Sequence, residues 1–155
     1  MKKIKLVIVI LFALNCSVLG QDVFRTGKNC IHLGGGFRSI GIDTYGANLS
    51  YERSVYEIPY IGYIGVELMG EVLFPESEIS PIATLRAIYH AGFFRTKVLD
   101  IYSGLGVAFA PSERYLVHPD IFLGFRVLPK HSKVGFFAEG AYYGSNVRAG
   151  VCFLW

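Results

Sequence analysis

Residues 61–74 read IGYIGVELMGEVLF, and this stretch decides the fold class because its two kinds of side chain alternate. Large apolar residues occupy every second position from Ile64 to Phe74 apart from Gly70, while Glu67 and Glu71 lie between them. A repeat of two residues puts successive side chains on opposite faces, which is the geometry of a β-strand rather than a helix. Residues 82–94 and 98–110 alternate in the same way.

Turn-forming residues divide the rest of the chain into similar runs. We predict eight strands, over 29–38, 44–53, 61–74, 82–94, 98–110, 119–128, 133–142 and 146–154. Most of these runs are longer than the usual globular strand of about five or six residues, and they suit a tilted membrane strand of about nine to eleven. The connections are short, which favours antiparallel neighbours. The sequence therefore predicts an all-β fold, an eight-stranded antiparallel up-and-down transmembrane β-barrel, with both chain ends on the periplasmic side.

The composition of the 155-residue chain supports one domain with an unusual surface. Hydrophobic residues make up 52% of the chain and charged residues only 17%, whereas a soluble domain carries about a quarter charged residues. The formal net charge is only +3, and no basic cluster follows the N-terminus, so we expect no nucleic-acid partner.

The first twenty residues have the layout of a secretory signal peptide. Lys2, Lys3 and Lys5 precede an apolar stretch, and small residues lead to Gly20. We predict a signal peptide over residues 1–20 and an outer-membrane barrel domain over residues 21–155. The alternative is a lipoprotein with lipid on Cys16, but Asn15 stands where a small residue is expected.

Alternation alone does not say which face of the barrel points outward, because soluble eight-stranded barrels alternate too. The less apolar face is rich in glycine and aromatic residues and carries few charges, as a narrow lumen would require. Lysine is absent from the strand interiors, and arginine supplies the basic charge there. We therefore predict that the apolar face contacts lipid and that the charged face lines the lumen. A soluble periplasmic ligand-binding barrel, with the faces reversed, is the alternative.

The inward charges would have to pair with one another, because a buried charge is stable only with partners. Counting from the turns, we predict the cross-strand pairs Glu71–Arg86, Glu67–His90, His90–Tyr102 and Tyr102–Arg126, with Glu139 diagonal to Arg148. The predicted lumen charge network comprises Glu67, Glu71, His90, Arg86, Asp100, Tyr102, Arg126, Glu139 and Arg148. The same alternation turns further side chains inward, namely Glu52, Asp120, His32 and Arg38. Such a network is either a structural polar core or a narrow ion or proton path.

The chain resembles the small eight-stranded outer-membrane barrels, the class of outer-membrane protein X and the membrane domain of outer-membrane protein A. The likeness runs from Asn29 to Trp155, and it is sharpest at the end, where Val151, Phe153 and Trp155 alternate up to a final aromatic residue. This ending resembles the signal read by the barrel-insertion machinery. Aromatic residues near strand ends would form interfacial girdles: Tyr45, Tyr51, Phe74, Phe93, Phe109 and Trp155. The resemblance implies a location in the bacterial outer membrane, with outer-membrane lipid and the insertion machinery as partners.

No motif predicts catalysis or a cofactor. The four histidines are dispersed without metal-ligand spacing, and no Ser-His-acid pattern is evident. Cys30 and Cys152 would lie on the two strands that close the barrel, either as a disulfide or as two buried thiols. We expect a non-enzymatic structural or interaction role. The alternatives are a narrow channel or transporter for a small or apolar ligand, and an envelope lipid-modifying enzyme.

Overall fold

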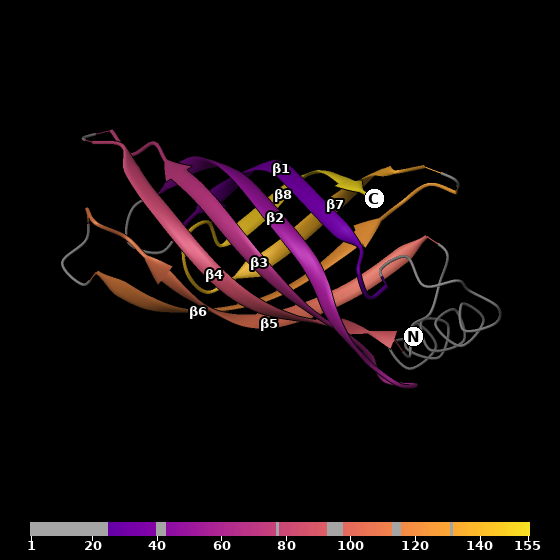
Figure 1. Ribbon diagram of the computed structural model, residues 1–155. Coiled ribbons are helices and arrows are strands. Elements are labelled where there is room, and N and C mark those ends of the chain that lie inside the picture. Colours follow the sequence, from indigo (N-terminus) through magenta and orange to yellow (C-terminus); the bar gives the residue numbers. More distant parts are fainter. Residues whose placement is uncertain (1–24, 40–42, 77, 93–97, 113–115, 131) are drawn as a thin grey trace, which may run out of the picture.

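The computed structural model is a closed barrel of eight strands, each antiparallel to the next along the chain (Figure 1). It describes residues 25–39, 43–76, 78–92, 98–112, 116–130 and 132–155. The strands are β1 (Asn29–Arg38), β2 (Thr44–Ile58), β3 (Gly62–Leu73), β4 (Ser80–Ala91), β5 (Leu99–Phe109), β6 (Val117–Val127), β7 (Val134–Ala141) and β8 (Val147–Leu154). The predicted fold, an all-β up-and-down barrel of eight strands, is confirmed.

The barrel closes where β1 pairs with β8, from Cys30 opposite Leu154 to Phe37 opposite Val147. Strands β1 and β8 therefore bring the first and last described segments to one end of the barrel, here called the termini end (Figure 1). The opposite end, where β3 turns into β4, is called the far end. No helix in the described ranges is long and apolar enough to cross a membrane. The predicted signal peptide and Phe93 lie outside the described residues.

Strand β2 is the one element whose bounds differ strongly from the prediction. It was predicted to end at Arg53, but it continues to Ile58 because its partner β3 extends as far as Gly62. The pairing shifts by one residue between Ser54 and Tyr56, which is a β-bulge. The alternation with a period of two breaks at this bulge. The sequence pattern therefore predicted that the strand ends there.

Strand β6 extends beyond its partner β7 at the far end. Their pairing stops at Phe122 opposite Ala141, although β6 begins at Val117. Pro119 lies in this extension, where a residue without a backbone N–H costs no ladder bond to β7. The sequence placed the start of β6 at this proline, two residues too late.

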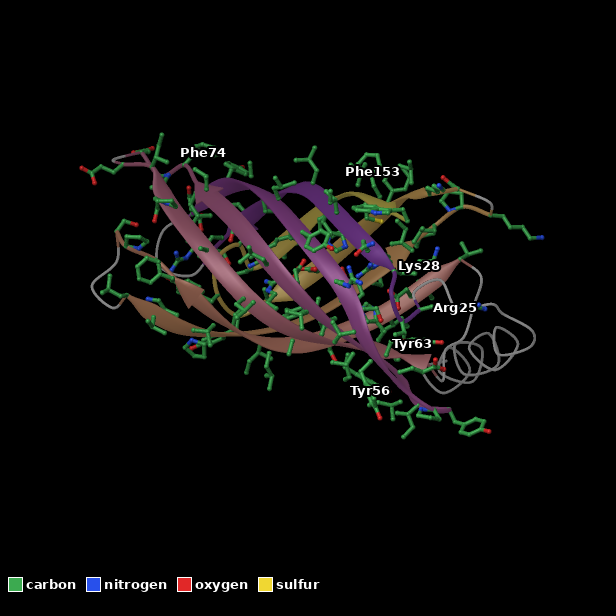
Figure 2. The ribbon with its side chains drawn as sticks, in the orientation of Figure 1. Arg25, Lys28, Tyr56, Tyr63, Phe74 and Phe153 are labelled. Carbon is green, nitrogen blue, oxygen red and sulfur yellow. The ribbon has the colours of Figure 1, made fainter. Side chains whose placement is uncertain are left out.

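The two faces of the sheet have the predicted polarity. Outward-facing Leu68, Leu85 and Val107 are 61%, 58% and 55% exposed, whereas inward-facing Glu67 and Arg86 are each 1% exposed. Figure 2 shows nitrogen and oxygen atoms gathered between the strands inside the barrel, with Phe74 and Phe153 outside near opposite ends. The structure is therefore a barrel with an apolar outer surface around a polar interior.

Candidate functional site: the charge network of the lumen

The nine residues predicted for the lumen network are all buried, and none is more than 8% exposed. The structure adds three ionisable side chains that the sequence had turned inward, Glu52, Asp120 and His32, each at most 2% exposed. Arg38 is only half-buried and lies at the far end, with its guanidinium 5.4 Å from the ring centre of Tyr143. Six carboxylates therefore share the lumen with three buried guanidinium groups and two imidazoles. Among the described residues, the buried carboxylates therefore outnumber the buried guanidinium groups two to one.

Arg86 joins three strands at the centre of the network. Its Nε and Nη2 lie 2.8 and 2.7 Å from Oδ2 of Asp120, and its Nη1 lies 3.1 Å from Glu67 and 3.2 Å from Glu139. The flat face of its guanidinium stacks 4.2 Å from the ring centre of Phe122. A planar group with donors on several edges can bind several carboxylates at once, which a lysine ammonium on a flexible stem does less well.

Arg126 holds a second cluster nearer the termini end. Its Nη2 lies 2.6 Å from Glu52, its Nε lies 3.2 Å from Asp100, and its guanidinium is 4.6 Å from the ring centre of Tyr102. His90 bridges the same two carboxylates, with Nε2 2.6 Å from Glu52 and Nδ1 2.9 Å from Asp100. Ionised carboxylates only accept hydrogen bonds. The His90 ring can therefore donate to both carboxylates only when both of its nitrogens carry protons.

Arg148 connects the network to the loop between β7 and β8. Its Nη1 lies 3.3 Å from Glu139, and its Nη2 donates to the carbonyl oxygen of Tyr143 at 2.8 Å. The backbone N–H of Ser145 donates to both carboxylate oxygens of Glu71 at 3.2 Å. Tyr143 and Ser145 are 7% and 0% exposed, so this loop folds into the far mouth of the barrel. The sequence predicted only a short connection between residues 142 and 146. It did not reveal that this loop fills the far mouth of the barrel.

Small residues make room for these long side chains. A Cβ atom placed on Gly124 would lie 2.7 Å from the Tyr102 ring and 2.8 Å from Cγ of Glu139. A Cβ atom on Gly106 would lie 2.8 Å from Cγ of Arg86. The lumen is therefore filled by charged and aromatic side chains that the inward glycines accommodate.

Clusters of buried apolar side chains lie on both sides of the network. The cluster at the termini end consists of Cys30, Leu128, Phe137, Cys152 and Leu154. The cluster at the far end consists of Leu73, Ile82, Ala108, Ala110 and Tyr143. The charge network therefore lies between two clusters of buried apolar side chains.

Most of the predicted cross-strand pairs are wrong in register. Glu67, not Glu71, stands opposite Arg86, and Asp100, not Tyr102, stands opposite Arg126. His90 stands opposite Tyr63 on β3, not Glu67, while its predicted pairing with Tyr102 on β5 is confirmed. Glu139 and Arg148 are directly opposite rather than diagonal. The predicted pairs were found by counting residues outward from the middle of each connecting loop. This fails when the two strands do not end at equal distances from that middle, as in β3 and β4, which pair as far as Leu73 opposite Ser80.

The cysteines of the seam are both free and buried, so the disulfide considered from the sequence is not formed in the structure. Cys30 stands opposite Leu154 and Cys152 opposite His32, so the two residues are diagonal neighbours. The Cys30 Sγ lies 3.4 Å from Nε2 of His32. No group of three or more His, Cys, Asp or Glu side chains in the described parts of the chain could hold a metal ion.

The residues of the predicted insertion signal lie on β8 or just after it. Phe153 and Trp155 point outward and are 42% and 46% exposed, while Val151 is half-buried. No protein-family model matches the chain, and no curated protein matches its sequence.

Proposed function

We propose that this chain is an integral β-barrel of the bacterial outer membrane with a non-enzymatic structural or interaction role. The observation that carries the proposal is the apolar outer wall. Outward pairs of large apolar residues recur between neighbouring strands: Leu33 with Leu49, Leu68 with Leu85, Leu105 with Ile121, and Phe136 with Val151. Soluble monomers rarely expose a continuous apolar patch of more than several hundred Å².

The filled lumen supports a structural role over transport. Each guanidinium in the lumen contacts at least two carboxylates, and clusters of buried apolar side chains lie on both sides of the network. A lipid hydrolase or acyltransferase would need a nucleophile with a base beside it and open to lipid. Among the described serines, Ser50 has a base beside it, with its Oγ 2.9 Å from Nδ1 of His32, but it is buried inside the lumen at 4% exposure and does not face lipid.

Membrane fractionation combined with gel mobility before and after boiling tests the proposal. We expect the protein in the detergent-extracted outer-membrane fraction, and we expect unboiled and boiled samples to migrate differently, because a closed barrel resists detergent until heated. A protein that is released into buffer without detergent, and that migrates identically in both samples, would be a soluble barrel instead.

A further inference from the structure

Exposed charges are separated between the two ends of the barrel. The termini end exposes five bases, Arg25, Lys28, Arg53, Lys130 and Lys133, of which Figure 2 labels the first two. Glu57 is the only exposed acid at this end among the described residues. The far end exposes three acids, Asp43, Glu76 and Glu78, with Arg38 half-buried among them. This separation is hidden in the small net charge of the chain.

The bases form one continuous arc, here called the basic rim and defined by Lys28, Arg53 and Lys133 with Arg25 and Lys130 beside them. Backbone hydrogen bonds connect the strand ends that carry them. Leu154 N donates to Lys133 O at 2.7 Å, Asn29 N to Trp155 O at 2.9 Å, and Ser54 N to Lys28 O at 3.0 Å. The rim therefore follows neighbouring strands β7, β8, β1 and β2 around one half of the barrel.

Two aromatic residues, Tyr51 and Trp155, lie beside the basic rim. The outward residues of β2 run Leu49, Tyr51, Arg53 toward the termini end, and the strand continues past Arg53 through the exposed residues Val55 and Tyr56. The ring centre of Tyr51 lies 6.5 Å from that of Trp155, next to the rim. Aromatic residues beside basic ones are expected where a barrel wall meets the lipid headgroups.

We propose that the basic rim binds the phosphate groups of anionic glycerophospholipids in the leaflet at the termini end. The inference rests on the proposed membrane location and adds a lipid class and an orientation to it. Lys and Arg donate charge-assisted hydrogen bonds to phosphate oxygens, and bases beside an anionic leaflet gain electrostatic attraction to it. The rim bases lie beside Tyr51 and Trp155, and tyrosine and tryptophan are the residue types enriched at the headgroup level of a membrane, which favours lipid over an acidic protein partner.

Trp155 is the only tryptophan of the chain and lies within the rim, so its fluorescence reports on the neighbouring lipid. The folded protein is placed in mixed vesicles of phosphatidylglycerol and phosphatidylcholine, with bromine quenchers on the acyl chains of one lipid class at a time. We expect phosphatidylglycerol to be enriched about fivefold near Trp155, equivalent to about 1 kcal/mol, the contribution typical of one base near an anionic surface. Raising the salt concentration should reduce the preference, because salt screens exposed charges.

Two variants identify the cause of any preference. The triple variant Lys28→Gln, Arg53→Gln, Lys133→Gln should bring quenching by the two lipid classes to parity. The matched control Asp43→Asn, Glu76→Gln, Glu78→Gln removes three exposed charges at the far end and should keep the preference. A preference that survives in the first variant, or equal quenching in the unmodified protein, overturns the basic rim while leaving the membrane location intact. A Trp155 signal that neither brominated lipid quenches overturns the membrane location, and the rim with it.

Discussion

At the scale of single residues, the interior is organised by three arginines that each have several acceptors. Arg86, Arg126 and Arg148 are at most 1% exposed, and each lies within 4 Å of at least two carboxylates. Removing a buried charge from water costs several kcal/mol, which only good geometry and multiple hydrogen bonds can offset. The stability of the barrel should therefore depend on complete sets of partners and not on individual ion pairs.

Replacing Arg126 with Leu should destabilise the folded barrel strongly. The substitution leaves Glu52 and Asp100 buried with only His90 to share, and breaking a buried pair by removing one partner costs about 3–5 kcal/mol. Reversible urea unfolding in lipid vesicles measures the change. The exposed substitution Glu76→Leu at the far end is the control and should unfold near the original urea concentration. Equal stability of the Arg126→Leu protein would mean that the network is not a stabilising core.

Gly124→Ala and Gly70→Ala form a matched pair that tests the packing of the lumen. The added methyl group at Gly124 would meet the Tyr102 ring and the Glu139 side chain, whereas nothing lies within 4 Å of a Cβ atom at Gly70. We expect Gly124→Ala to cost about 1–3 kcal/mol, typical of overpacking, and Gly70→Ala to change little. The same unfolding experiment compares them, and a loosely filled lumen would make the two variants alike.

At the scale of elements, the loop between β7 and β8 is shaped by carboxylates from other strands. Tyr143 N donates to Asp120 of β6 at 3.3 Å, and Ser145 N donates to Glu71 of β3. Gly144 has a φ of +70°, and a Cβ atom there would clash with a Glu71 carboxylate oxygen. Glycine is therefore required at position 144 for two reasons. Its backbone has a positive φ, and the Glu71 carboxylate lies where a side chain would stand.

Replacing Glu71 with Leu should release this loop from the mouth. Ser145 N would lose its acceptor, and a buried donor without a partner costs about 1–3 kcal/mol. We expect the Ser145 amide hydrogen to exchange with solvent at least about tenfold faster, since about 1.4 kcal/mol corresponds to a factor of ten. Hydrogen exchange followed by NMR in detergent micelles measures this, with the Phe125 amide in β6 as an internal reference. An unchanged exchange rate of the Ser145 amide hydrogen would show that packing alone holds the loop in the mouth of the barrel.

At the scale of the whole molecule, the barrel combines a core of buried charged side chains with an apolar exterior. Eight strands enclose only enough space for side chains, and here charged residues fill it between two apolar clusters. The lumen is therefore filled by side chains, and the exposed charges of the described residues are separated between the two ends of the barrel.

The whole barrel should not conduct ions. In planar bilayers we expect the purified protein to give no steady single-channel current, because the network and the two apolar clusters occupy the lumen. Protein heated until it has lost its folded mobility is the control for leakage through the bilayer itself. Discrete openings given only by the folded protein would restore the narrow channel as its function.

The sequence by itself determined the strand number, the fold class and which face of each strand points inward. A period of two divides the side chains of a strand between two faces, and the glycine-rich composition of the face that carries Glu67 and Arg86 turned that face inward without knowledge of the partner strands. Only the tertiary structure decided that Glu67 rather than Glu71 meets Arg86, that β2 continues past a bulge, and that Ser145 closes the far mouth. Register and loop path depend on how the strands stagger and close around the barrel, and a sequence pattern along one strand does not contain that information.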